Sequence, residues 1–236
     1  MNENDYLNSR PLKKVTFKTS AAENYMSSEA YKTLRTNIIF CGSDIKSIVI
    51  TSAVSGEGKS TISSELAKSL SDTGKRTLLI DADMRKSAFL NASQRSGEIK
   101  GLSELLSGIS EIDEVLYGTQ EENFDVIFTG HFPPNPVELL GNGKLKQILD
   151  AFKERYDYIL IDAPPLAPVI DAAVIAQSVD AAMIVISAGK AHRKDIMKAK
   201  EQLEKSGTRL LGVILNENDK RNSRTTSKRK KYKYYY

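Results

Sequence analysis

Short, continuous hydrophobic runs alternate along the chain with stretches in which hydrophobic residues recur every three or four positions. The continuous runs are typical of strands covered on both faces, and the recurring pattern is typical of helices packed on one side. The runs lie at residues 47–51, 77–80, 125–128, 158–161, 181–186 and 210–215. The helical patterns lie at residues 27–40, 61–71, 102–106, 136–153, 170–177 and 190–205. This alternation predicts an α/β fold, with a mostly parallel central sheet and helices on both faces.

The two ends of the chain differ in composition from the part between them. Residues 1–26 are polar and lack sustained periodicity, which predicts an N-terminal segment that runs over the surface or stays mobile. Residues 220–236 hold eight Lys or Arg residues, four tyrosines and no acidic residue. No repeat or linker divides the rest, so we expect one domain over residues 27–219, followed by a basic, tyrosine-rich tail.

Composition excludes several classes of protein. With 40% hydrophobic and 27% charged residues, the chain is typical of globular proteins. No apolar run approaches the roughly 18 residues of a membrane span, and no basic stretch precedes an apolar core as in a secretory signal. Cys41 is the only cysteine, which excludes an internal disulfide framework. We therefore expect a cytoplasmic protein.

The net charge of +4 belongs to the tail. Outside the tail, 26 basic and 30 acidic residues leave a net charge of −4. The basic balance of the whole chain is therefore no sign of a nucleic-acid-binding domain, and we expect no nucleic-acid partner.

The first predicted strand runs into a glycine-rich segment, residues 53–60. It matches the phosphate-binding pattern G-x-x-x-x-G-K-[ST], except that Ala53 replaces the first glycine. Glycines let the backbone curl so that successive N–H groups face a phosphate, and the following helix adds its positive end. Lys59 can bridge the terminal phosphates, and the Ser60 hydroxyl can ligate Mg²⁺. The expected nucleotide-binding residues here are Ser55, Gly56, Glu57, Gly58, Lys59, Ser60 and Thr61.

Acidic residues follow two further predicted strands. Asp81 and Asp83 come after the strand at 77–80, and Asp162 ends the strand at 158–161. The carboxyl ends of parallel strands meet at one edge of a sheet, so these acids and the phosphate-binding loop should share a crevice. Carboxylates beside phosphates suit Mg²⁺ binding and proton acceptance. The sequence predicts a magnesium–nucleotide site, with Ser60 and the three aspartates as metal ligands.

Asn216 ends the last predicted strand. Its amide is suited to contact a purine edge, and a solvated position at the end of the strand is an equal alternative.

Together these motifs resemble the bacterial tyrosine kinases of capsule and exopolysaccharide synthesis, which are P-loop proteins unrelated in fold to eukaryotic protein kinases. The resemblance covers essentially the whole chain. Its segments are residues 55–61, the Walker A′ segment 79–85, the Walker B segment 161–165, and residues 101–106 and 133–140. It implies a protein-tyrosine kinase that uses ATP and Mg²⁺, with Lys59, Asp81 and Asp83 as catalytic residues. Which of the two aspartates accepts the proton stays open. It also implies autophosphorylation of a C-terminal cluster at Tyr232, Tyr234, Tyr235 and Tyr236.

The resemblance further implies partners. The family works with a membrane adaptor, here expected on a separate chain, that activates the kinase and recruits it to the inner face of the cell membrane. Other protein tyrosines are expected substrates, and a cognate phosphatase is an expected partner. Glu29, Lys32 and Arg35 resemble the motif through which the family assembles into rings, although its middle position is normally arginine. Lys32 keeps the charge without the bidentate fork, so we expect weaker assembly. Ser87 stands where family members often carry proline.

Two other classes remain as alternatives. Partition and septum-positioning ATPases carry a signature lysine five residues before the P-loop lysine, and Val54 occupies that position here. Alternatively, the basic tail binds nucleic acid or an anionic membrane surface without any catalysis. That interpretation leaves the nucleotide motifs unexplained.

Overall fold

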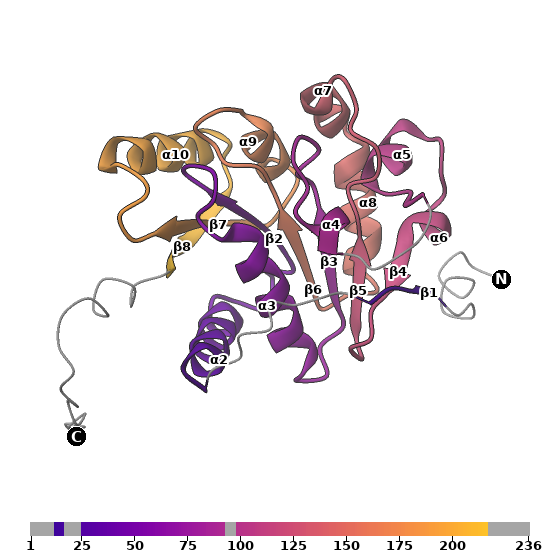
Figure 1. Cartoon of the computed structure of the whole chain (residues 1–236), viewed down its shortest axis with the longest axis horizontal. Helices are drawn as coiled ribbons and strands as arrows, with labels where there is room; N and C mark the ends of the chain where they lie inside the picture. The colour runs from indigo at the N-terminus through magenta and orange to yellow at the C-terminus, as the bar shows by residue number, and fades with distance from the viewer. Residues whose placement is uncertain (1–11, 17–24, 93–97, 217–236) are drawn as a thin grey trace.

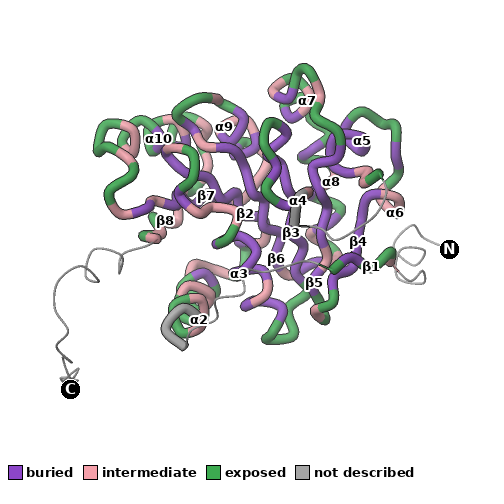
Figure 2. The backbone as a smooth tube through the Cα atoms, in the orientation of Figure 1, coloured by how far each residue is buried: buried purple, intermediate pink, exposed green. Residues whose placement is uncertain are grey.

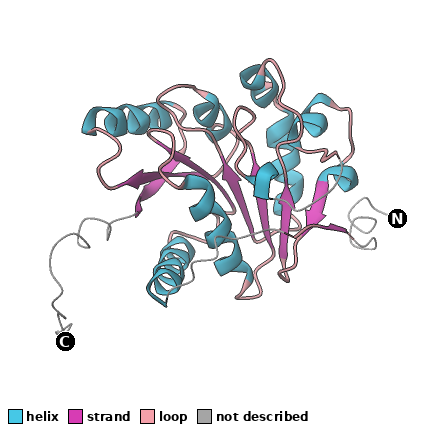
Figure 3. Cartoon of the chain, viewed as in Figure 1, coloured by secondary structure: helices cyan, strands magenta, loops and turns pink. Residues whose placement is uncertain are grey.

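The computed structural model describes residues 12–16, 25–92 and 98–216. These residues form an eight-stranded sheet with helices on both faces (Figures 1 and 3), which confirms the predicted fold class. Its strand order is β1 (Lys13–Lys14), β4 (Leu116–Gly118), β5 (Phe124–Ile127), β3 (Thr77–Asp81), β6 (Tyr158–Asp162), β2 (Ser47–Ser52), β7 (Ala181–Ser187) and β8 (Arg209–Asn216). Neighbouring strands are parallel except for β4 and β5.

The helices divide between the two faces of the sheet (Figure 1). One face is covered by α2 (Tyr25–Phe40), α3 (Lys59–Ser71) and α4 (Phe89–Ala92). The opposite face is covered by α5 (Leu102–Ser107), α6 (Ile112–Val115), α7 (Pro136–Gly141), α8 (Lys144–Lys153), α9 (Asp171–Ala176) and α10 (Arg193–Lys205). Every residue of β2, β3 and β6 is buried, as Figure 2 shows for the centre of the sheet. Covering on both faces explains why these strands are hydrophobic without alternation.

The single helix predicted over residues 136–153 is wrong, because two helices, α7 and α8, occupy this stretch. The helix is interrupted at Asn142 and Gly143, and Gly143 has φ +83°. This left-handed conformation is open to glycine but strained for most residues, and it cannot continue a helix.

The prediction that residues 1–26 run over the surface or stay mobile is wrong for Val15, which lies in the core at 4% exposure. Lys13 and Lys14 are exposed, and they form β1, which pairs with β4. Moreover, α2 begins at Tyr25, two residues before the expected start. Strand β4 and the short helices α4 and α6 were not predicted. Within the described ranges, no helix is long and apolar enough to cross a membrane.

Candidate active site

The phosphate-binding loop joins the end of β2 to the start of α3. Gly56 and Gly58 have φ +79° and +87°, so the turn uses the glycines where it needs left-handed backbone. Gly58 also has no room for a side chain, because an added Cβ would lie 2.2 Å from Nδ2 of Asn216. The N-cap residue of α3 is Gly58, which has no side chain to cap the helix. The first N–H groups of α3 are thus available to a bound anion.

Two predicted nucleotide-binding side chains are engaged within the protein. Glu57 is buried, and its carboxylate accepts hydrogen bonds from the N–H groups of Val54 (2.9 Å) and Ser187 (3.1 Å). The side-chain N–H of Asn216 donates to the Glu57 carbonyl at 2.9 Å. The side chains of Glu57 and Asn216 therefore stabilise the loop through contacts within the protein. A contact of either side chain with a nucleotide stays a prediction.

The structure brings the loop and the acidic residues together, as the strand ends suggested. Asp81 and Asp162 are register partners on β3 and β6. Nζ of Lys59 lies 3.1 Å from Oδ2 of Asp83 and 3.2 Å from Oδ2 of Asp162. The Ser60 hydroxyl donates to Oδ2 of Asp162 at 2.6 Å. One ammonium group thus faces a cluster of three buried carboxylates.

Burial raises the pKa values of Asp81 and Asp162. Asp81 is fully buried, and burial followed by the charge of Asp162 raises its pKa to about 7. Burial also raises the pKa of Asp162, although Lys59 and Ser60 offset part of the effect. Burial lowers the pKa of Lys59, but attraction by Asp162 and Asp83 outweighs it, and the net shift is upward. Lys59 is therefore held in its charged form.

Ser87 is a site residue whose role the sequence did not reveal. Its hydroxyl donates to Oδ2 of Asp81, and its oxygen accepts the N–H groups of Phe89 (3.2 Å) and Leu90 (3.1 Å) at the start of α4. Proline has no side-chain donor for such a bond. Ser87 therefore fixes the orientation of Asp81 and anchors it to the short helix that follows.

The sequence also did not reveal the pairing of Arg85 with Asp171 beside the site. Arg85 makes two hydrogen bonds to Asp171, from Nε to Oδ2 at 2.9 Å and from Nη2 to Oδ1 at 3.1 Å. Asp171 is fully buried at the start of α9. A bidentate pair of this kind is geometrically specific. It ties the Walker A′ segment to the end of the loop that follows Asp162.

These segments enclose a cavity of about 600 Å³. It is lined by Ser55, Gly56, Gly58, Lys59, Ser60, Thr61, Asp83, Arg85, Lys86, Ser87, Ala88, Pro164, Pro165, Pro168 and Val169. The lining includes the backbone of the loop and Lys59, which suit phosphates. It also includes prolines, Val169 and Ala88, which suit an aromatic ring. The cavity thus offers surfaces both for a phosphate chain and for a phenol.

Comparison with known proteins agrees with this geometry. The family model described as an AAA domain matches residues 45–210. The chain is 44% identical over 188 residues to "Tyrosine-protein kinase CpsD" of Streptococcus agalactiae, covering 80% of this chain and 82% of that protein. The structure of the kinase domain of Escherichia coli tyrosine kinase ETK superposes with a TM-score of 0.81 at 33% identity, covering 100% of this chain and 92% of that one. The chain belongs to the bacterial tyrosine-protein kinase family.

A septum-positioning ATPase is similar to a smaller extent. MinD of Pyrococcus horikoshii OT3, solved in complex with Mg-ADP, matches with a TM-score of 0.61 at 27% identity, over 74% of this chain and 71% of that one. The kinase family and this ATPase share the P-loop architecture, which supports nucleotide binding by the present chain. That the cavity is the binding site stays a prediction.

The donor atoms of this kinase-family site fit a metal ion that is shared with a nucleotide. Among the described residues, no group of three or more His, Cys, Asp or Glu side chains is arranged to hold a metal by itself. Mg²⁺ commonly binds one or two carboxylates together with substrate phosphates and water. The adjacent oxygens of Ser60 and Asp162 match that pattern. Ligation by Ser60, Asp81, Asp83 and Asp162 stays a prediction.

The residues that resemble the family's assembly motif lie on α2. Lys32 pairs with Glu29 on the exposed face, at 2.8 Å between Nζ and Oε1. Arg35 instead donates to the carbonyl of Ser69 on α3 at 2.6 Å. Arg35 thus joins α2 to the body of its own chain, and a role of these residues in assembly stays a prediction. The tyrosine cluster, Tyr232, Tyr234, Tyr235 and Tyr236, lies outside the described residues.

Proposed function

We propose that the chain is an ATP-dependent protein-tyrosine kinase that regulates capsule or exopolysaccharide synthesis. The observation that carries this proposal is the position of Lys59 beside Asp83 and Asp162, at a cavity whose lining includes Lys59, Asp83 and several apolar residues. The names of the relatives support the same activity.

The proposed mechanism is positioning combined with electrostatic stabilisation. The N–H groups of the loop and Lys59 hold the β- and γ-phosphates of ATP. The phenolic oxygen of an acceptor tyrosine attacks the γ-phosphorus, and the bond from that phosphorus to the β,γ-bridging oxygen breaks, which releases ADP. A phenol has a pKa of about 10 and must lose its proton as it reacts. Asp81 or Asp83 accepts that proton.

The two candidate bases differ in their surroundings. Asp83 lines the cavity and also accepts the backbone N–H of Lys86 at 3.0 Å. Asp81 is fully buried behind it and is held by Ser87. Ser60 and Asp162 would hold Mg²⁺ together with the phosphates. When bound, Mg²⁺ would neutralise part of the charge on the transferred phosphoryl group.

The acceptors and partners are proposed from the family resemblance. The acceptors include Tyr232, Tyr234, Tyr235 and Tyr236 of the tail, as well as tyrosines of other proteins. The kinase works with a membrane adaptor on a separate chain, which brings it to the inner face of the cell membrane. It assembles into a homo-oligomeric ring, and a cognate phosphatase reverses its reaction. No nucleic-acid partner is proposed.

The test incubates the purified full chain with γ-labelled ATP and Mg²⁺, and follows label in protein tyrosine and in free phosphate. Transfer to tyrosine supports the kinase. Release as free phosphate alone would instead support an ATPase switch, the second candidate, which the MinD similarity favours. Val54, in place of the signature lysine of those ATPases, argues against that candidate.

A matched variant tests the metal site. We expect Asp162→Asn to need roughly tenfold more Mg²⁺ for half-maximal transfer, because the change removes one ligand charge. Its binding of Mg²⁺-free nucleotide should change much less. An unaltered Mg²⁺ titration would contradict the role proposed for Asp162.

A further inference from the structure

The tight turn after β7 lies directly against the phosphate-binding loop. The N–H of Lys190 donates to the Ser187 carbonyl at 3.1 Å, which closes the turn, and Gly189 supplies φ +82°. The N–H of Ser187 donates to the Glu57 carboxylate, and Asn216 donates to the Glu57 carbonyl. The turn and the loop are therefore fixed to each other, and a side chain on the turn has a defined position relative to any bound phosphate.

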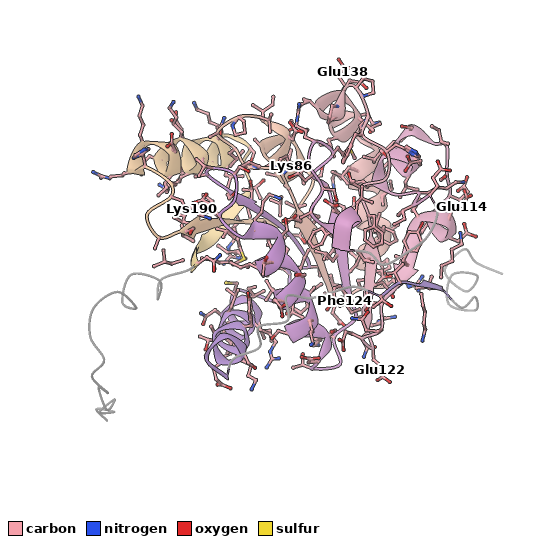
Figure 4. The ribbon with its side chains drawn as sticks, in the orientation of Figure 1. Lys86, Glu114, Glu122, Phe124, Glu138 and Lys190 are labelled. Carbon is pink, nitrogen blue, oxygen red and sulfur yellow. The ribbon has the colours of Figure 1, made fainter. Side chains whose placement is uncertain are left out.

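The side chain of Lys190 crosses from this turn to the loop. Its ammonium donates to the carbonyl of Gly56, a residue that lines the cavity. Figure 4 shows Lys190 on the side of β7 and β8, while Lys86 lies nearer the middle of the molecule. In a phosphate-binding loop the N–H groups face the anion and carbonyls face outward. The ammonium of Lys190 thus lies at the outer edge of the phosphate-binding loop, and its four-carbon side chain is flexible.

The charges of the site favour another cation at this edge. Asp81, Asp83 and Asp162 face one ammonium, that of the partly buried Lys59. A nucleotide brings further negative charge, even with Mg²⁺ bound. Arg85 lines the cavity, but Asp171 holds its guanidinium. The Lys190 ammonium donates to the neutral carbonyl of Gly56, and a hydrogen bond to an ionised phosphate is roughly twice as strong.

We propose that Lys190 is a phosphate-binding residue of this site. It leaves the Gly56 carbonyl when a nucleoside di- or triphosphate binds, and its ammonium then donates to a phosphate oxygen. This inference rests on the proposed kinase function and adds a second lysine, from a different element, to the P-loop lysine.

The experiment measures the affinity of the full chain for Mg-ADP and for a non-hydrolysable Mg-ATP analogue by calorimetry. The variants are Lys190→Met, Lys190→Gln and Lys190→Arg, and Lys194→Met is the control. Lys194 is exposed on the first turn of α10, so its removal changes the net charge equally. We expect Met and Gln at position 190 to weaken binding about tenfold, the usual scale for a hydrogen bond to a charged group. Arg should retain affinity within about threefold, and the control within about twofold.

The glutamine variant separates phosphate binding from support of the loop. Glutamine keeps an N–H donor for the Gly56 carbonyl but has no charge. If Lys190→Gln binds nucleotide as tightly as the wild type, Lys190 only supports the loop and the inference is wrong. Equal losses in Lys190→Met and Lys194→Met would also overturn it, because a diffuse charge effect would then suffice.

Salt dependence gives an independent readout. Wild-type affinity should fall more steeply with salt than that of Lys190→Met, since one charge pair is missing in the variant. Parallel salt dependences would count against the inference. A wild-type chain that binds no nucleotide would reject the proposed function itself. A wild type that binds and phosphorylates, beside an unaltered Lys190→Met, would reject this inference alone.

Discussion

Lys59 lies between two buried carboxylates, and this position alters the expected effect of removing it. A P-loop lysine that contacted only the ligand could be changed to methionine without loss of stability. In the structure the ammonium of Lys59 is 3.1 and 3.2 Å from carboxylate oxygens of Asp83 and Asp162. Removal of one partner of a buried ion pair leaves an uncompensated charge and is strongly destabilising.

We therefore expect Lys59→Met to abolish tyrosine phosphorylation and also to lower the melting temperature. The loss of stability should be larger at pH 8 than at pH 6, because burial raises the pKa of Asp162 and this carboxyl takes up a proton more readily at lower pH. Thermal unfolding without nucleotide and phosphotyrosine detection check the two effects. Lys59→Arg keeps a positive charge and should lose less stability. Undiminished phosphorylation in Lys59→Met would contradict the assignment of the site.

Asp81 gives a pH-dependent prediction with a defined sign. Its pKa of about 7 in the folded protein lies above the ordinary value of 3.8, so the folded state binds a proton more tightly than the unfolded state. The ionised carboxylate then costs stability increasingly from about pH 4 to pH 7. In metal-free buffer, Asp81→Asn should be more stable than the wild type by on the order of 2 kcal/mol at pH 8.

The difference between Asp81→Asn and the wild type should shrink toward pH 5, where the wild-type carboxyl is protonated. Melting temperatures measured across this range provide the test. Asp150→Asn is a suitable control, since Asp150 is half exposed on α8. If the difference in melting temperature between Asp81→Asn and the wild type does not vary with pH, the pKa of Asp81 does not lie near 7.

At the scale of elements, success of prediction depended on whether the signal was local. The central strands were predicted because burial on both faces gives a continuous hydrophobic run. The P-loop was predicted because its glycines and lysine stand at fixed spacing within eight consecutive residues. The break at Gly143 was missed, because the helical periodicity continues across it. Strand β1 is two residues long and is defined by its pairing with β4. Such pairing has no local pattern.

The same reasoning applies to the supports of the site. Ser63 donates to Oδ1 of Asp162 at 3.1 Å across 99 positions of sequence, and Arg85 reaches Asp171 across 86. No spacing rule connects such positions. The hydroxyl contact from Ser87 to Asp81 spans only six residues. Serine before a short helix is a capping signal, and it could have indicated Ser87 as the start of α4.

Substitutions on helix α2 should distinguish effects on assembly from effects on folding stability. Arg35 fastens α2 to Ser69 of α3, whereas Glu29 contacts Lys32 at the surface. We expect Glu29→Ala to reduce the mass seen in sedimentation while the melting temperature changes little, since exposed ion pairs contribute about 0–1 kcal/mol. Arg35→Glu should lower both. An unchanged mass for Glu29→Ala would leave Glu29 as an ordinary solvated residue.

At the scale of the whole molecule, the order of the central strands explains why the site could be predicted. β3, β6 and β2 are adjacent and parallel, so Asp81, Asp162 and the P-loop emerge at one edge of the sheet. The motifs alone show that each strand ends in a functional residue. Parallel pairing of neighbours then places those residues within contact distance.

The charge distribution of the whole chain suggests how its tail reaches a site. Residues 220–236 carry eight basic residues beside four tyrosines, while the rest of the chain has a net charge of −4. The acidic cluster of Asp81, Asp83 and Asp162 at the site attracts such a segment. Seventeen residues could span on the order of 50 Å, enough to reach a neighbouring subunit. Each added phosphate contributes roughly −1.5 to −2 charges, which should reverse the attraction.

We therefore predict phosphorylation between chains, followed by weaker self-assembly. The test mixes Lys59→Met protein, which has an intact tail, with active protein whose tail tyrosines, Tyr232, Tyr234, Tyr235 and Tyr236, are changed to phenylalanine. Phosphate should appear on the tail of the inactive partner, because only that chain carries acceptors in its tail. Each protein incubated alone is the control and should show no tail phosphorylation. If the mixture also shows none while the wild type labels itself normally, transfer occurs within one chain.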